Sequence, residues 1–156
     1  MAAQQLDGLV VGSDTVIELD GQLMGKPVDL QDARIMLARL AGRVHRVHTA
    51  VALCSREPEI ELIEVDTAKV EMKPDYEHLY DGYLASQESL GKAGAYAIQG
   101  RGGDLVDHVN GDYTTVVGLP LALVARLLWT AGYPVPVNVK EVYQRKPYAN
   151  WGHFGG

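Results

Sequence analysis

Several residue types are scarce in this sequence, and their scarcity excludes whole classes of protein. Among 156 residues only Cys54 is a cysteine, so an internal disulfide framework cannot form and a reducing compartment is indicated. Cys54 lies in an apolar, strand-like run, which favours core packing over a role as a nucleophile. The 14 Lys and Arg are outnumbered by 20 Asp and Glu, which gives a net charge of -6. This balance argues against non-specific binding to nucleic acid or to an acidic membrane surface.

Long apolar runs are missing as well. No stretch approaches the roughly 18 consecutive apolar residues of a membrane span, and the first residues lack the basic and apolar regions of a signal peptide. We therefore expect a cytoplasmic protein without a membrane partner. What remains is an ordinary globular composition, 47% apolar and 22% charged. It fits one domain that is large enough for a proper core.

Residues 8–27 form the first candidate site. Their leading apolar residues predict a buried strand, and residues 12–15 predict a break at its carboxyl end, where open α/β sheets place ligands. A second short strand then reaches Asp20-Gly21, a strong hairpin signal. Asp14 and Lys26 would lie at the two ends of this hairpin, and their side chains could face one shared opening. Without other evidence, an Asp followed by Thr after a strand is more often a turn or cap residue than a catalytic one.

The apolar spacing predicts the remaining elements. Helices are expected after the cap Asp29, after Pro74-Asp75 and from Pro120. Two long strand-like runs, residues 43–56 and 60–72, predict a hairpin. The first run should lie centrally with both faces covered, because both its odd and its even positions are apolar. In the second run the apolar residues change from odd to even positions, and a bulge near Thr67 would explain this change.

Shorter signals follow in the second half. Residues 95–98 predict a short strand, and Asn110-Gly111 predicts a hairpin between 105–109 and 113–117. Residues 133–156 are rich in proline and aromatic residues and lack periodicity. They predict a partly ordered tail over the surface of a domain of residues 1–132, with an interaction peptide as the alternative.

Three further patterns have a simple structural interpretation. Tyr76, Tyr80 and Tyr83 recur at helical spacing, which favours a buried helix face over a base-stacking platform. The glycines of residues 99–103 match neither the P-loop nor the GxGxxG fingerprint. His45 and His48 are three apart on a predicted strand and should point to opposite faces, so they cannot chelate one ion together.

Several segments, in order, resemble the Maf family of nucleoside triphosphate pyrophosphatases, also called septum formation inhibitor proteins. They read VVGSDTVI, MGKPVD, ARLAGRVHRVHTAVAL, GKAGAYAIQG and NGDYTTVVGLPL, and they cover residues 8 to about 130. The resemblance implies an α/β fold with a twisted mixed sheet flanked by helices, and a cleft for a nucleotide and a divalent cation, Mg²⁺ or Mn²⁺. The AIQG form resembles the branch that hydrolyses dTTP and UTP to the monophosphate and pyrophosphate.

The resemblance also implies roles for five residues. Asp14 of GSDT matches the family's proton acceptor, which would activate water and lie beside the metal. Lys26 and Lys92 match basic residues near the phosphates. Thr15 and Gln99 match positions associated with substrate selection, and a glutamine amide offers both a donor and an acceptor to the imide edge of uracil or thymine.

The sequence also departs from the family pattern. Family members begin with a strand, a loop bearing a serine and paired arginines, and a helix with a metal-binding glutamate, and we expect this strand and helix to be missing here. Gly91 precedes Lys92 where the family usually has an aspartate. We therefore expect weak activity or none, and the alternative function is a nucleotide-binding or regulatory protein connected with division arrest. Apolar edges and the aromatic tail favour a homodimer.

Overall fold

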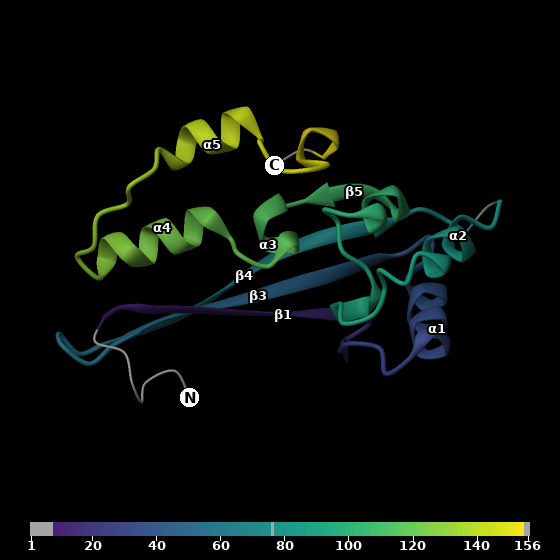
Figure 1. The fold of residues 1–156 in the computed structure, drawn as a ribbon, viewed down its shortest axis with the longest axis horizontal. Coiled ribbons are helices and arrows are strands. Elements are labelled where there is room, and N and C mark those ends of the chain that lie inside the picture. Colours follow the sequence, from purple (N-terminus) through teal and green to yellow (C-terminus); the bar gives the residue numbers. More distant parts are fainter. Residues whose placement is uncertain (1–7, 76, 155–156) are drawn as a thin grey trace.

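The computed structural model describes residues 8–75 and 77–154, and five strands form one sheet in this part of the chain (Figure 1). The strand order is β2-β1-β3-β4-β5, and all four pairings are antiparallel. The α/β class is confirmed, whereas the mixed sheet that the resemblance implies is antiparallel throughout the described residues. The strands are β1 (Val10–Leu19), β2 (Gln22–Met24), β3 (Val44–Ser55), β4 (Ile60–Met72) and β5 (Val106–Asn110).

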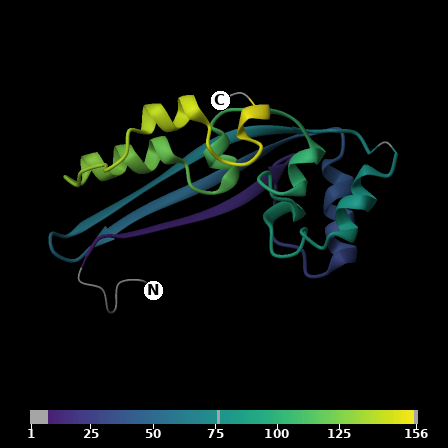
Figure 2. The same ribbon diagram turned by 45° about the horizontal axis from the view of Figure 1, so that its top comes forward.

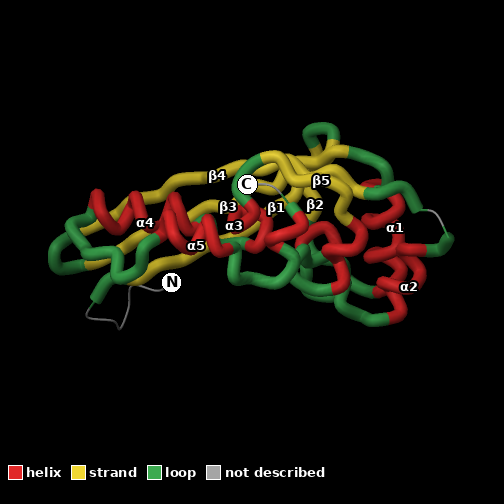
Figure 3. The backbone as a smooth tube through the Cα atoms, turned by 90° about the horizontal axis from the view of Figure 1, so that it is seen from above, coloured by secondary structure: helices red, strands yellow, loops and turns green. Residues whose placement is uncertain are grey.

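Helices gather on one face of this sheet and at one of its ends (Figures 1 and 2). Helices α3, α4 and α5 lie over the long strands, and α1 and α2 pack against each other beyond the end of β1. Seen from above, α4 runs along the β3–β4 hairpin (Figure 3). The helices are α1 (Leu30–Leu40), α2 (Leu79–Ala85), α3 (Tyr113–Val117), α4 (Leu121–Thr130) and α5 (Val139–Arg145), with 3-10 turns η2 (Ala93–Ala95), η3 (Arg101–Leu105) and η4 (Trp151–His153).

Strand β1 is longer than the sequence predicts. Residues 10–18 pair with β3 in unbroken register, so the break expected at residues 12–15 is wrong. Pairing with a neighbouring strand overrides the local preference of Gly12 and Asp14 for a turn. The first half of β1 is also more open than a buried strand, with Val11 44% exposed. The turn at Asp20-Gly21 is confirmed, and both residues have positive φ, as a tight hairpin turn requires.

The central hairpin is confirmed, but only one of its faces is covered. β3 lies in the middle of the sheet, and the side chains of its covered face are buried: His45, Val47, Thr49, Val51 and Leu53. The opposite face of β3 is only partly buried. The bulge predicted near Thr67 is wrong, because β3 and β4 pair continuously there. The change of the apolar residues from odd to even positions has another cause. The odd-numbered Ile63 and Val65 lie on the open face of the sheet, where they are 62% and 60% exposed.

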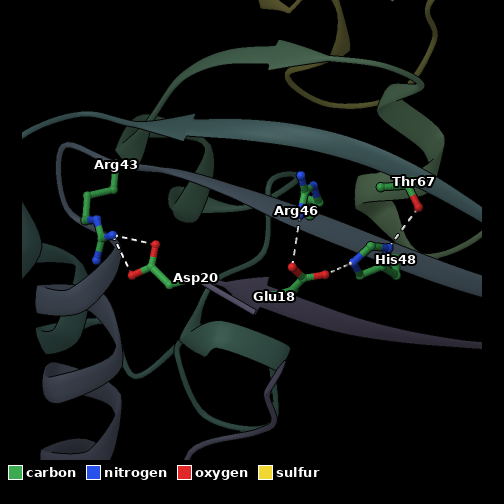
Figure 4. Close-up of polar contacts among 6 residues, drawn as sticks. All are labelled: Glu18, Asp20, Arg43, Arg46, His48 and Thr67. Atoms are coloured by element: carbon green, nitrogen blue, oxygen red, sulfur yellow. Dashed lines mark hydrogen bonds and ion pairs between the residues drawn. The ribbon is translucent and has the colours of Figure 1, made fainter. Parts of the chain in front are cut away.

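A polar ladder crosses this open face of the sheet (Figure 4). His48 on β3 lies between its neighbours, with Nδ1 2.8 Å from Thr67 Oγ1 and Nε2 2.8 Å from Glu18 Oε2. The hydrogen bond from His48, with Arg46 as a second partner, holds the pKa of Glu18 below its usual value. His45 points into the buried face instead, so the prediction that the two histidines diverge is confirmed.

The three predicted helices are confirmed as α1, α2 and α4. Asp29 caps α1 by accepting a hydrogen bond from the Asp32 backbone N–H, and α1 buries one face in the core. Tyr80 and Tyr83 of α2 are buried, as the helical spacing predicts, and Tyr76 lies outside the described residues. Leu127 of α4 packs on the covered face of β3 in a small second core.

Two shorter predictions are wrong. Residues 113–117 form helix α3 instead of a strand, because Asp112 accepts a hydrogen bond from Thr114 N–H as an N-cap and Gly118, at φ 111°, closes the helix. The capping aspartate therefore outweighs the hairpin signal of Asn110-Gly111. Residues 95–98 form no strand, and the chain turns through η2 instead.

The last segment is more ordered than a surface tail. Residues 139–145 form α5, and Trp151 is fully buried against the ring of Tyr113, with ring centroids 5.4 Å apart. The Tyr143 hydroxyl donates to the carboxylate of Asp112, the cap of α3. Aromatic rings, which carry no helical periodicity here, thus join this segment to the main core.

Candidate active site

A cavity of about 320 Å³ opens beside the middle of β1. Its walls come from β1, from the loop that follows α2, and from the end of α3. All five residues singled out in the sequence line it: Asp14, Thr15, Lys26, Lys92 and Gln99. Residues from the first 26 positions and from positions 91–99 therefore meet around one space, which the chain order alone does not show.

A glycine contact joins the two sides of this cavity. The backbone N–H of Gly94 donates to the carbonyl of Gly25, with N and O 3.0 Å apart. Gly94 has φ +64°, and a Cβ there would lie 2.4 Å from Ile17 Cδ1. Glycine alone fits this approach without strain. Because Gly25 and Gly94 are close in sequence to Lys26 and Lys92, their contact brings both lysines to the same rim.

The two lysines give the rim its positive charge. Both side chains belong to exposed residues, and neither forms an ion pair within the described ranges 8–75 and 77–154. An ammonium group without a carboxylate partner is available to an anionic ligand. The rim therefore suits phosphate groups.

Asp14 occupies a different position from the one its sequence context predicts. It lies within β1, on the side where β2 pairs only with Ile17–Leu19, so it belongs to an open strand edge. Its Oδ1 accepts a hydrogen bond from the Thr15 backbone N–H, 3.0 Å away. Because side chains alternate along a strand, its carboxylate leaves β1 on the side opposite to Ser13 and Thr15. Asp14 thus contributes an exposed carboxylate at the margin of the cavity.

Hydroxyl groups make the inner wall. Ser13 Oγ donates to the carbonyl of Gly118 over 2.9 Å, and Thr15 Oγ1 lies 2.8 Å from Thr49 Oγ1. Thr49 in turn donates to the carbonyl of Thr115 over 2.8 Å. Reasoning from the sequence missed these partners. A threonine in the otherwise apolar run around Thr49 was the available signal, since a buried hydroxyl needs a hydrogen-bond partner.

The floor of the cavity is apolar and uncharged. Tyr96 lines it and is held by a 2.8 Å hydrogen bond between its hydroxyl and His45 Nε2. Burial lowers the pKa of His45 to about 4 and raises that of Tyr96 well above its usual value. At neutral pH the pair is therefore uncharged, and the charge of the site resides at the lysines and Asp14.

The backbone on both sides of Gln99 is held by the last segment of the chain. The side-chain amide of Asn150 donates to the carbonyls of Ile98 and Gly100, at 2.8 and 3.1 Å, on either side of Gln99. The Asn150 amide fits beside Gly103 only because Gly103 lacks a side chain. A Cβ at this position would lie 2.5 Å from Asn150 Nδ2. Gln99 itself is exposed and reaches the cavity.

The protein ligands available to a metal ion are few. Asp14 is the one carboxylate among the described residues that line the cavity, and no cluster of three or more His, Cys, Asp or Glu suited to a metal ion occurs in the described part of the chain. Mg²⁺ commonly binds through one or two carboxylates together with substrate phosphates and water. A single carboxylate beside a phosphate-binding rim fits that mode of binding.

None of the helices within the described residues combines the length and apolar character that a membrane crossing requires.

Comparison with known proteins agrees with the resemblance seen in the sequence. The chain is 48% identical over 124 residues to a dTTP/UTP pyrophosphatase of Thermus thermophilus, 47% over 135 residues to one of Bordetella parapertussis, and 40% over 133 residues to one of Dictyoglomus thermophilum. These alignments cover 80%, 86% and 85% of this chain. They span 65%, 64% and 69% of the relatives, so the chain matches about two thirds of their length. Residues 1–131 match the family model described as Maf-like protein, and the chain therefore belongs to the Maf family.

Proposed function

We propose that this protein hydrolyses dTTP and UTP to the monophosphate and pyrophosphate. The observation that carries the proposal is the meeting of Asp14, two lysines without ion-pair partners and Gln99 around one cavity. The names of the relatives supply the reaction and the two nucleotides. The cavity supplies a positive rim for phosphates and an uncharged floor for a base.

Each of these residues would have a distinct part in the reaction. Asp14 would accept a proton from the water that attacks the α-phosphorus, and the bond to the bridging oxygen of the β-phosphate would break to release pyrophosphate. Lys26 and Lys92 would stabilise the negative charge on the phosphate oxygens. Gln99 would hold the base through its amide.

We include a divalent cation, Mg²⁺ or Mn²⁺, in this proposal. Asp14 would hold it together with the phosphates of the nucleotide, as the donor set of the cavity allows. Such an ion, when bound, neutralises charge on phosphate oxygens.

A second candidate is a protein that binds nucleotides without hydrolysing them. The observation that favours it is the scarcity of carboxylates: Asp14 has no second carboxylate beside it in the described lining of the cavity. The same positive rim would then bind a nucleotide with little or no turnover.

Two measurements on the same protein separate the two candidates. Pyrophosphate release from dTTP, UTP, CTP and ATP is measured with MgCl₂ or MnCl₂, and nucleotide binding is measured by calorimetry on the same protein. We expect Asp14→Asn to lower the rate for UTP by roughly 10²–10⁴-fold, the usual contribution of a general base. Asp107→Asn, an exposed carboxylate on β5, is the matched control and should leave the rate unchanged. Binding without turnover by the unmodified protein would favour the second candidate.

A further inference from the structure

The direction of one hydrogen-bond chain beneath the cavity is fixed by the number of protons available. Thr49 is fully buried and has a single hydroxyl proton, which it donates to the carbonyl of Thr115. A carbonyl oxygen can only accept, so this proton has no other place. Thr49 Oγ1 must then accept from Thr15 Oγ1, 2.8 Å away. The proton of Thr15 is therefore used inside the protein, and Thr15, which lines the cavity, has only hydroxyl lone pairs to offer a ligand there.

Ser13 is oriented in the same way. Its hydroxyl proton is donated to the carbonyl of Gly118, which leaves only lone pairs for the cavity. Gly118 packs closely above Thr15, since a Cβ there would lie 3.3 Å from Thr15 Oγ1. The inner wall formed by Ser13 and Thr15 thus offers acceptors and no side-chain hydroxyl donor.

A wall of acceptors selects the part of a nucleotide that can lie against it. Phosphate oxygens would meet lone pairs there, so the phosphates belong at Lys26 and Lys92 on the rim. The wall then takes a group that donates. Uracil and thymine share an imide N–H, whereas cytosine has an unprotonated ring nitrogen at the same position.

We propose that Thr49 is a positioning residue for base selection: it holds the Thr15 hydroxyl as an acceptor, and the Ser13–Thr15 wall accepts the imide N–H of a uracil or thymine ring. This inference rests on the proposed function for the choice of nucleotides. It adds a residue that touches no substrate, and it gives a reason why a cytosine nucleotide would be rejected. An acceptor facing an acceptor leaves both groups without a hydrogen bond in a partly buried site.

Thr49→Val tests the inference, because valine has the shape of threonine without the hydroxyl. The Thr115 carbonyl keeps a partner in this variant, since the Gly118 N–H also donates to it over 3.1 Å. Thr15 loses its acceptor and is free to turn its proton toward the cavity. We expect CTP to bind about tenfold more tightly than to the unmodified protein, the value of one hydrogen bond, with little change for UTP. Thr49→Ser keeps the hydroxyl and should keep the original preference.

The measurement is the ratio of the dissociation constants of UTP and CTP, by calorimetry, for the unmodified protein and each variant. If Thr49 had only a structural role, its replacement would weaken the binding of both nucleotides alike and leave the ratio unchanged. An unchanged ratio would therefore overturn the inference. Thr67→Val, on the open face of the neighbouring strand, is the control for losing a threonine hydroxyl from this sheet.

A second arm needs no variant and therefore does not depend on folding of the Thr49→Val protein. UTP methylated at the imide nitrogen lacks the donor, and the unmodified protein should bind it about tenfold more weakly than UTP. Equal binding of the two would overturn the inference even if UTP is hydrolysed. Conversely, absence of pyrophosphate release with the expected binding ratios would count against the proposed hydrolysis alone.

Discussion

His45 makes the stability of this protein depend on pH in a window that the structure specifies. The side chain is 2% exposed, its Nε2 contacts the Tyr96 hydroxyl, and its Nδ1 has no hydrogen-bond partner among the described residues. Burial lowers its pKa from 6.5 to about 4. Between these values the unfolded chain binds a proton that the folded chain does not, so stability is complete above pH 6.5 and is lost as the pH falls.

The size of the loss follows from the two pKa values of His45. The full difference, 6.5 to about 4, corresponds to about 3 kcal/mol at 1.36 kcal/mol for each pKa unit. At pH 5 the loss relative to pH 7.5 is about 2 kcal/mol. The carboxylates with lowered pKa, Glu18, Glu64 and Asp81, lose their contribution below their unfolded pKa values of 4.5, 4.5 and 3.8, which lie below both pH values of this comparison.

Urea unfolding at pH 7.5 and pH 5.0 measures this prediction. The unmodified protein should lose about 2 kcal/mol more than the variant His45→Gln, which places an amide near the Tyr96 hydroxyl and cannot titrate. His108→Gln is the control, because His108 is exposed on β5. If His45→Gln shows the same loss between the two pH values as the unmodified protein, burial of the neutral imidazole is not the cause and the reasoning fails.

Two further substitutions test how the cavity is held. Gly94→Ala should destabilise the fold by about 1–3 kcal/mol, because φ is positive and the new Cβ meets Ile17; Gly12→Ala, with open space around it, is the control in thermal unfolding. Asn150→Ala removes both hydrogen bonds that flank Gln99 and should cost about 1–2 kcal/mol while weakening the proposed preference for UTP over CTP. A preference that is unchanged despite the lost stability would show that Asn150 supports the fold and does not position Gln99.

The elements that could be predicted from the sequence were those in which apolar residues recur with a strong period. Helix α1, from its cap Asp29 to Leu40, and the β3–β4 hairpin follow directly from the spacing of apolar residues. The failures occurred where two signals competed. Residues 12–15 have a turn-like composition, but they pair with the twelve-residue strand β3 and form a strand instead. Residues 113–117 contain the β-branched run TTVV, but the Asp112 cap makes them a helix. Local propensity decides neither case, because pairing and capping partners determine the outcome.

The candidate site divides in a similar way. The resemblance singles out Asp14, Lys26 and Gln99, and the structure brings them to one cavity, but their roles stay predictions until activity is measured. The hydroxyl partners could not be predicted, because Thr49 lies 34 residues from Thr15 and its proton direction depends on a backbone carbonyl. Sequence motifs indicate which side chains face a ligand, whereas the groups that orient them follow only from the packed structure.

The two ends of the cavity depend on different parts of the chain, and under the proposed function this division would affect substrate selection. The lysine rim is set by the contact of Gly94 with Gly25, inside the family match of residues 1–131. The loop carrying Gln99 is fixed by Asn150, which lies beyond that match. If the proposed function holds, a change in the last segment would therefore alter which base is accepted while the lysine rim is retained. Under the proposed function, nucleotide preference is accordingly the property expected to vary separately from phosphate binding.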